Sequence, residues 1–141
     1  HLARRFFGSL SKRPPEPEEE AWARSQLLPG ELELWVRMSN QDRRHSALVA
    51  RRFVSVRPEA TRAEIAGALL HDVGKIECGL GTWGRVAATV LGRRGRRFTL
   101  YHDHEQIGAE LAAEAGSYPE TVDLIAERGD VFPIMHACYR A

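Results

Sequence analysis

The apolar residues of this chain follow helical spacing from about residue 30 onward, and this pattern limits the fold more than any other feature. Leu48, Val49, Phe53 and Val54 recur on one helix face. The apolar–polar alternation of a half-buried β-strand persists nowhere in the sequence. We therefore predict an all-α fold, with one compact bundle of about six helices.

Capping signals predict where several of these helices begin and end. Ser39 is expected to be an N-cap. Thr61 and Ser117 each precede a glutamate by three residues, the spacing of a capping box. One helix is expected to stop at Gly74, a residue suited to the left-handed turn after a helix, and another to end at Gly116. After Asp130 the helical signal fades.

Residues 1–20 are predicted to be a flexible tail, and residues 21–141 to form the single domain of this 141-residue chain. Prolines at 14, 15 and 17 and a run of three glutamates end the tail. Its basic, aromatic start could lie on a membrane surface. Docking of Phe6 or Phe7 on the domain is the favoured interpretation.

The composition points to a globular, cytoplasmic protein, with 43% hydrophobic and 28% charged residues. The net charge of +1 favours no particular partner, so a nucleic-acid partner is possible but unsupported, and no apolar run reaches the length of a membrane span. We see no secretory signal. Cys78 and Cys138 form no CxxC pair, so reduced thiols are expected.

Four residues form a possible metal-ligand set, namely His45, His71, Asp72 and His104. Imidazole and carboxylate groups suit Mn, Fe, Co, Ni or Zn. A single histidine on an apolar helix is more often a hydrogen-bonded core residue than a ligand. However, a buried imidazole beside a carboxylate is costly unless both are paired or bind a metal. Neighbouring residues on a helix point about 100° apart, so a complete site needs ligands from other helices.

The segment Leu69-Leu70-His71-Asp72-Val73-Gly74-Lys75 is far more specific than the dipeptide His-Asp alone. It resembles the HD(I/V)GK signature of the HD superfamily of metal-dependent phosphohydrolases. His45 matches the histidine on an earlier helix of that family. The segment His104-Glu105-Gln106-Ile107-Gly108-Ala109-Glu110-Leu111 is similar to a later motif of its longer members.

The resemblance implies an HD-type helical domain that binds one or two divalent metal ions (Mn, Fe, Co, Ni, Zn or Mg). In this family the metal lowers the pKa of bound water, and the hydroxide attacks a phosphate ester. His45, His71 and Asp72 would hold one metal with a late carboxylate, and Asp72 and His104 a second. Lys75 would neutralise phosphoryl oxygens, although a cation after a helix also complements the helix dipole.

The late ligands of the family are not matched. Where relatives carry a further histidine, this chain has residues 127–130, and residues 132–141 contain no aspartate. Asp130 is the nearest candidate for the late carboxylate, and Asp123 is the next. His136 is a further candidate ligand, although a lone histidine there is more often a surface residue.

A small phosphorylated molecule is the expected partner. The basic loop Arg93, Arg94, Arg96 and Arg97 could bind its phosphate, because arginine makes bidentate phosphate contacts. A solvated surface loop is an equally good interpretation of these arginines. His102 is a possible substrate contact.

Three functions are compatible with these features. The first is hydrolysis of a nucleotide or other phosphoester. The second is a degenerate, non-catalytic HD domain for sensing or interaction, suggested by the missing late aspartate. The third is oxygen activation at a di-iron centre, which would need a full set of six ligands.

Overall fold

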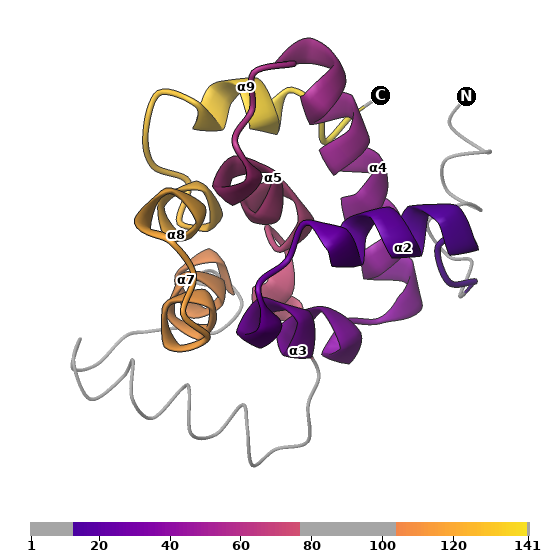
Figure 1. Ribbon diagram of the computed structural model, residues 1–141. Coiled ribbons are helices and arrows are strands. Elements are labelled where there is room, and N and C mark those ends of the chain that lie inside the picture. The colour runs from indigo at the N-terminus through magenta and orange to yellow at the C-terminus, as the bar shows by residue number, and fades with distance from the viewer. Residues whose placement is uncertain (1–12, 77–103, 141) are drawn as a thin grey trace.

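The structure is a computed structural model that describes residues 13–76 and 104–140, and these residues form a helical bundle (Figure 1). They contain seven α-helices, one 3₁₀ helix and no strand, which confirms the all-α prediction for this part of the chain. In chain order the helices are α2 (Pro17–Ser25), α3 (Pro29–Arg37), α4 (Asn40–Val56), α5 (Arg62–Leu69), the 3₁₀ helix η1 (Val73–Lys75), α7 (His104–Glu114), α8 (Pro119–Ile125) and α9 (Phe132–His136).

Helix α2 begins within the segment predicted to be a tail. Pro17 occupies the first turn, where its missing N–H costs nothing, and three glutamates there face the positive end of the helix dipole. The last of them, Glu20, accepts a 3.0 Å hydrogen bond from the indole nitrogen of buried Trp35. The expected boundary at residue 20 therefore falls inside a helix, while residues 1–12 lie outside the described residues.

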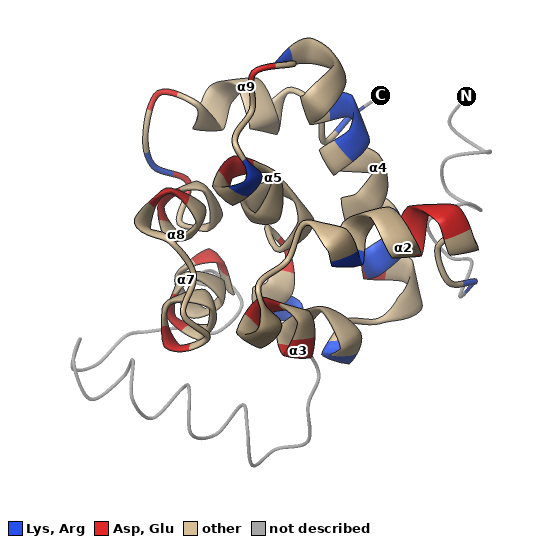
Figure 2. Ribbon diagram, in the orientation of Figure 1, with Lys and Arg blue, Asp and Glu red and all other residues tan. Residues whose placement is uncertain are grey.

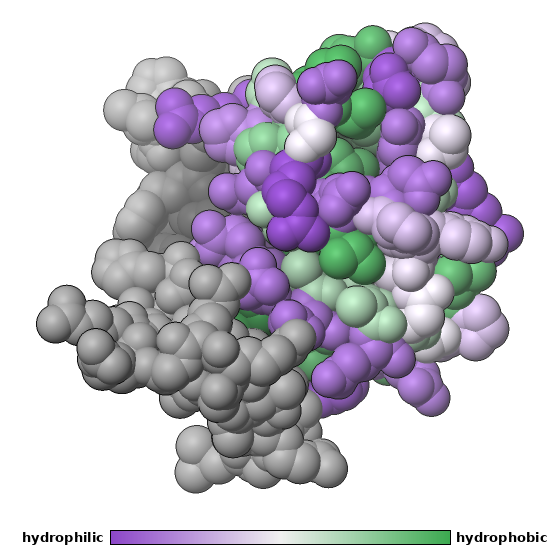
Figure 3. All heavy atoms as spheres, turned by 90° about the vertical axis from the view of Figure 1, so that its left-hand side faces the viewer, coloured by the Kyte–Doolittle hydropathy of each residue, from purple (hydrophilic) through white to green (hydrophobic). Residues whose placement is uncertain are grey.

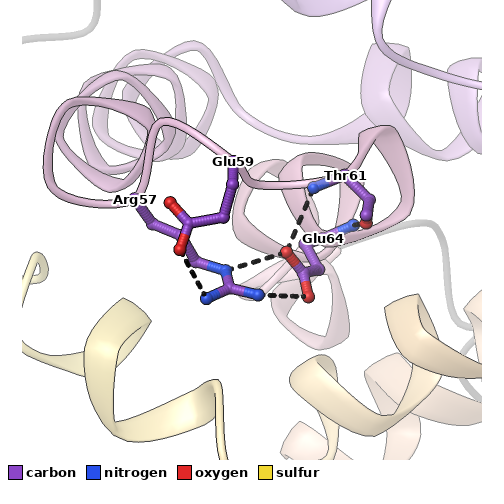
Figure 4. A network of polar contacts seen from close by, with 4 residues as sticks. All are labelled: Arg57, Glu59, Thr61 and Glu64. Carbon is purple, nitrogen blue, oxygen red and sulfur yellow. Dashed lines mark hydrogen bonds and ion pairs between the residues drawn. The ribbon is translucent and has the colours of Figure 1, made fainter.

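Two of the predicted helix caps are confirmed. The Ser39 hydroxyl accepts the Asp42 N–H at 3.1 Å at the start of α4. At the start of α5, Thr61 and Glu64 form a reciprocal capping box with both distances at 3.1 Å (Figure 4). Arg57 also forms a bidentate ion pair with Glu64, with N–O distances of 3.0 and 3.3 Å. These contacts fix the turn between α4 and α5.

Two other predicted helix boundaries are wrong, namely the cap of α8 at Ser117 and the end of α5 at Gly74. The Ser117 hydroxyl donates to the buried Glu31 carboxylate at 2.6 Å, and α8 has Tyr118 as its N-cap with no side-chain cap bond. Helix α5 ends at Leu69, before Gly74, which lies within η1. A Cβ at Gly74 would collide with the His104 carbonyl, so close packing of η1 on α7 is what requires glycine here.

Helix α5 lies at the centre of the bundle, between α4 and α8 (Figure 1). Its small residues allow this packing: a Cβ at Gly67 would lie 2.9 Å from Leu124 Cβ. The largest fully buried apolar side chains come from nearly every helix, namely Trp35, Phe53, Leu69, Leu70, Ile107, Ile125 and Met135. The core therefore surrounds the last turn of α5, where the His-Asp dipeptide follows.

The segment after Asp130 forms a short helix, α9, that packs against α4. Met135 and Cys138 are buried there, so this end of the chain belongs to the bundle. Five residues are too few to show helical periodicity, which explains why the sequence signal fades.

The surface of the described residues mixes charges of both signs. Acidic residues gather in the first turn of α2 and basic residues on α4 (Figure 2). On the side of α7 and α8, small hydrophobic areas are separated by hydrophilic side chains (Figure 3). None of the described helices has both the length and the apolar character needed to cross a bilayer.

Candidate metal centre

Helix α4 and the turn after α5 bring three of the predicted ligands together. His45 lies in the second turn of α4, while His71 and Asp72 occupy the turn between α5 and η1. Leu70 and Val73 flank that turn and are fully buried. Buried apolar neighbours on both sides hold the His-Asp backbone in one position, which is the requirement for a preorganised site.

The side chains of His45, His71 and Asp72 form a group that could hold a metal ion. One ligand atom from each lies within 4.8 Å of the other two. The two imidazole rings meet edge to face, with centroids 5.7 Å apart. His71 is buried, whereas His45 and Asp72 keep some exposure, so the group opens toward solvent on one side. We call these three residues the triad.

The tautomer of His71 is fixed by the backbone. Its Nδ1 lies 2.7 Å from the Ala68 carbonyl oxygen, which can only accept a hydrogen bond, so Nδ1 carries the hydrogen. Its Nε2 faces Asp72 Oδ2 at 3.2 Å. In a neutral ring both of these atoms are acceptors, and their approach is favourable only with a proton or a cation between them. The donor set therefore fits a metal ion.

Burial and charge set the protonation of the other two ligands. Burial lowers the pKa of His45 below its usual 6.5, and the neighbouring His71 lowers it further, which favours the neutral ring that binds metals. Burial acts to raise the pKa of Asp72, but the hydrogen bond with His71 and the charges of His71 and Lys75 outweigh it. The net effect holds the pKa of Asp72 well below its usual 3.8, so Asp72 is a carboxylate at neutral pH.

Lys75 stands at the rim of the triad. Its Nζ lies 3.5 Å from Asp72 Oδ1, and about half of its side chain (48%) is exposed. It also lines the adjacent cleft, so its ammonium group can meet a solvent-borne anion without leaving Asp72. Lys75 also lies in the last turn of η1, where a cation complements the negative end of the helix dipole. This position is the alternative explanation for a lysine here.

The structure does not bring the other predicted ligands into the triad. Asp130 is exposed, and Asp123 is exposed and paired with Arg128 at 3.2 Å. His104, at the start of α7, lies 3.2 Å from Glu105. Within residues 13–76 and 104–140, the triad is the only group of three or more such side chains with all its ligand atoms that close together. A second metal held by Asp72 and His104 therefore remains a prediction.

The predicted phosphate-binding residues lie outside the described part of the chain. These are Arg93, Arg94, Arg96, Arg97 and His102. Their role as substrate contacts remains a prediction.

Tyr139 belongs to the site but was missed by the sequence analysis. Its ring stacks on His71 with centroids 4.4 Å apart and an angle of 21° between the planes. Burial, followed by the nearby charge of Asp72, raises the pKa of Tyr139, so it remains a neutral phenol. The contact joins the C-terminal segment to the centre of the bundle, and no short-range pattern in the sequence predicts it.

Glu127 is a late carboxylate that the sequence analysis passed over in favour of Asp130. It has a left-handed backbone, with a φ of 64°. Burial raises its pKa, and so does the charge of Glu105, while His136, His104 and His71 act in the opposite direction. Glu127 therefore senses the triad electrostatically without belonging to it.

A cleft of about 760 Å³ opens beside the triad. One face of α4, together with Asp72, Lys75 and Tyr139, lines it, and residues 13–16 and Glu19 also contribute. The cleft has six Arg and Lys side chains against four carboxylates. Since His45 and Asp72 are among its lining residues, the cleft gives solvent access to the triad.

Comparisons of this chain with protein-family models, with curated proteins and with solved structures gave no match. The resemblance to the HD superfamily therefore remains a prediction from the sequence motifs quoted above.

Proposed function

We propose that this protein is a metal-dependent phosphohydrolase of the HD type that acts on a nucleotide or other phosphoester. The observation that supports this most directly is the contact between His71 Nε2 and Asp72 Oδ2, which in the neutral ring are two acceptors facing one another, as a metal ion would require of its ligands. The mainly cationic cleft beside the triad suits a phosphorylated substrate.

Three protein ligands with further positions open are the arrangement expected of a catalytic metal rather than a structural one. His45, His71 and Asp72 would hold the ion. When bound, a divalent metal supplies a water-derived nucleophile at neutral pH and polarises the phosphoryl group.

The residues of this chain then have separate tasks. The Ala68 carbonyl keeps the Nε2 lone pair of His71 directed at the site. Tyr139 covers the outer face of that ring and restricts the access of water to it. Lys75 would neutralise phosphoryl oxygens as the bond from phosphorus to the leaving oxygen breaks.

The test is phosphate release from a panel of nucleotides and from p-nitrophenyl phosphate, with and without Mn²⁺. We expect metal-dependent turnover by the parent protein and none by Asp72→Asn. Lys75→Gln should lower kcat about a hundredfold, the usual cost of losing one electrostatic contact to the transition state. Arg128→Gln is the matched control, because it removes an exposed cation that does not line the cleft.

The non-catalytic module is the second candidate function. It is favoured by the small ligand set, because among the described residues the structure gathers three ligands and leaves Asp130 exposed. The module would be supported over the hydrolase if the protein binds metal and a phosphoester but turns over no phosphoester.

A further inference from the structure

A second cationic centre lies along α4 from the triad. His45, Leu48 and Arg52 all line the cleft. Seven residues make two helical turns, so His45 and Arg52 share one face of α4, about 10 Å apart along its axis. The cleft therefore extends from a metal-binding end to an arginine end.

Arg52 is held in place but its charge is not neutralised. Its Nη1 donates to the Cys138 carbonyl at 3.3 Å, and its side chain is partly buried. Across the two described stretches, no carboxylate pairs with Arg52 or with Arg140, which also lines the cleft. The adjacent Arg51 differs, because it binds Glu19 at 2.9 and 3.1 Å.

The stretch between the two ends is apolar on the α4 side. Leu48 is 48% exposed and lines the cleft between His45 and Arg52. Pro14 and Pro15 also line the cleft. Along this face of α4 the cleft thus offers, in order, the imidazole of His45, the apolar side chain of Leu48 and the guanidinium of Arg52.

We infer that the ligand of this cleft is an elongated phosphoester with a second anionic group, a phosphate or a carboxylate, about 10 Å from the first. The first anion lies at the triad and Lys75, so the inference rests on the proposed function. The second anion binds Arg52, with Arg140 beside it. An apolar or planar part of the ligand covers Leu48.

The chemistry of guanidinium supports this assignment. Its planar donors match the oxygens of phosphate and carboxylate, and such charge-assisted bonds are about twice as strong as neutral ones. The four carboxylates of the cleft belong to Glu16, Glu19, Asp42 and Asp72, and none of them binds Arg52. An incoming anion therefore meets no bound competitor at Arg52.

The test measures binding by the full chain in Mn²⁺ with probes that cannot be hydrolysed. Hexane bisphosphonate has two anions on a six-carbon chain, hexyl phosphonate has one anion, and propane bisphosphonate is too short to reach both ends. By calorimetry, we expect the hexane bisphosphonate to bind about tenfold more tightly than either of the others, the effect of one charge-assisted contact.

Arg52→Gln should remove this preference, because glutamine can still donate to the Cys138 carbonyl but carries no charge. Arg52→Lys should retain part of it, and the control Arg128→Gln all of it. Equal affinity for the three probes in the parent protein would overturn the inference, as would a preference that survives Arg52→Gln, or no binding of any probe.

This result is separate from that of the hydrolase assay. A preference for hexane bisphosphonate without phosphoester turnover would leave the two-anion site and remove the hydrolytic function. Phosphoester turnover without a preference for hexane bisphosphonate would leave the hydrolytic function and remove the two-anion site.

Discussion

His71 shows how one residue can be prepared for a metal by its immediate surroundings. The Ala68 carbonyl fixes the hydrogen on Nδ1, and Tyr139 fixes the plane of the ring. The Nε2 lone pair is then directed at Asp72. Metal ligands with a backbone or carboxylate partner of this kind hold their ions more tightly, because the tautomer is set in advance.

Glu127 gives a pH-dependent prediction at the same scale. Although Glu127 is mostly exposed, partial burial of its carboxyl group raises its pKa above 4.5, so the folded state disfavours its ionised form. The favourable contribution of protonated Glu127 to the stability of the fold is complete below pH 4.5. It is lost as the pH rises through the raised pKa of Glu127. Glu127→Gln should therefore increase the free energy of unfolding at pH 7, by less than about 1 kcal/mol because the side chain is exposed.

Urea unfolding at pH 7 and pH 4 measures this effect. The gain from Glu127→Gln should disappear at the lower pH, and Glu120→Gln, on the exposed first turn of α8, is the control. An equal gain at both pH values would contradict the assigned cause.

The proximity of His45, His71 and Asp72 could be predicted from sequence because a motif of seven neighbouring residues and one earlier histidine single them out, whereas their binding of a metal remains a prediction. Tyr139 could not be predicted in this way. Its contact with His71 depends on where α9 packs against α4, and α9 is too short to show a period. Asp130 was preferred over Glu127 by residue type, whereas backbone geometry and burial decide which carboxylate senses the site.

At the scale of elements, the sequence predicted a helix cap correctly where no residue distant in sequence binds the capping side chain. Thr61 caps α5 because its partner Glu64 is three residues away. Ser117 has the same spacing to a glutamate, but its hydroxyl is used by Glu31, 86 residues away in sequence. The buried Glu31 needs this partner, and the need outweighs a cap on an exposed helix end.

Thr61→Ala should destabilise the fold by about 1 kcal/mol, the usual cost of losing an N-cap. The loss leaves the Glu64 N–H without its acceptor, while Arg57 still holds the Glu64 carboxylate (Figure 4). Chemical denaturation measures the change, and Thr61→Ser is the control that keeps the hydroxyl. A loss of the same size in Thr61→Ser would show that the methyl group, rather than the cap, matters.

The contact of η1 with α7 gives a second prediction for the elements. A Cβ at Gly74 would overlap the His104 carbonyl and lie 3.0 Å from the Gly108 nitrogen, both of them backbone groups that cannot move aside alone. We expect Gly74→Ala to cost about 3 kcal/mol or more.

Gly129→Ala is a useful comparison for Gly74→Ala. Gly129 has a φ of 94° and open space around it, so an alanine there would be strained in its backbone but would meet no clash. Thermal unfolding should show the smaller loss for Gly129→Ala. If the two variants were equally destabilised, the close packing of η1 on α7 would not be the reason for glycine at position 74.

At the scale of the whole molecule, the triad lies where segments from both ends of the described chain meet. Residues 13–16 line the cleft, α4 forms one wall, and Tyr139 from the segment after α9 stacks on His71. An ion bound there joins α4 to the end of α5. Because a ligand that binds only the folded state stabilises it, metal and fold should be coupled.

Metal should therefore raise the melting temperature of the whole domain. At a hundred times its dissociation constant, a single bound ion contributes about 2.7 kcal/mol to folding. We expect Mn²⁺ to raise the Tm of the chelator-treated parent and to leave His45→Gln unchanged, as measured by calorimetry. An equal rise in both proteins would place the stabilising ion outside the triad.

The metal content of the protein tests the central claim most directly. The parent, Asp72→Asn and the control Asp123→Asn would be dialysed to equilibrium against Mn²⁺, and bound metal measured by plasma mass spectrometry. We predict about one or two ions per chain for the parent and Asp123→Asn, and none for Asp72→Asn, because two nitrogen ligands without the carboxylate hold Mn weakly. An empty parent, or an Asp72→Asn variant that keeps its metal, would contradict the account.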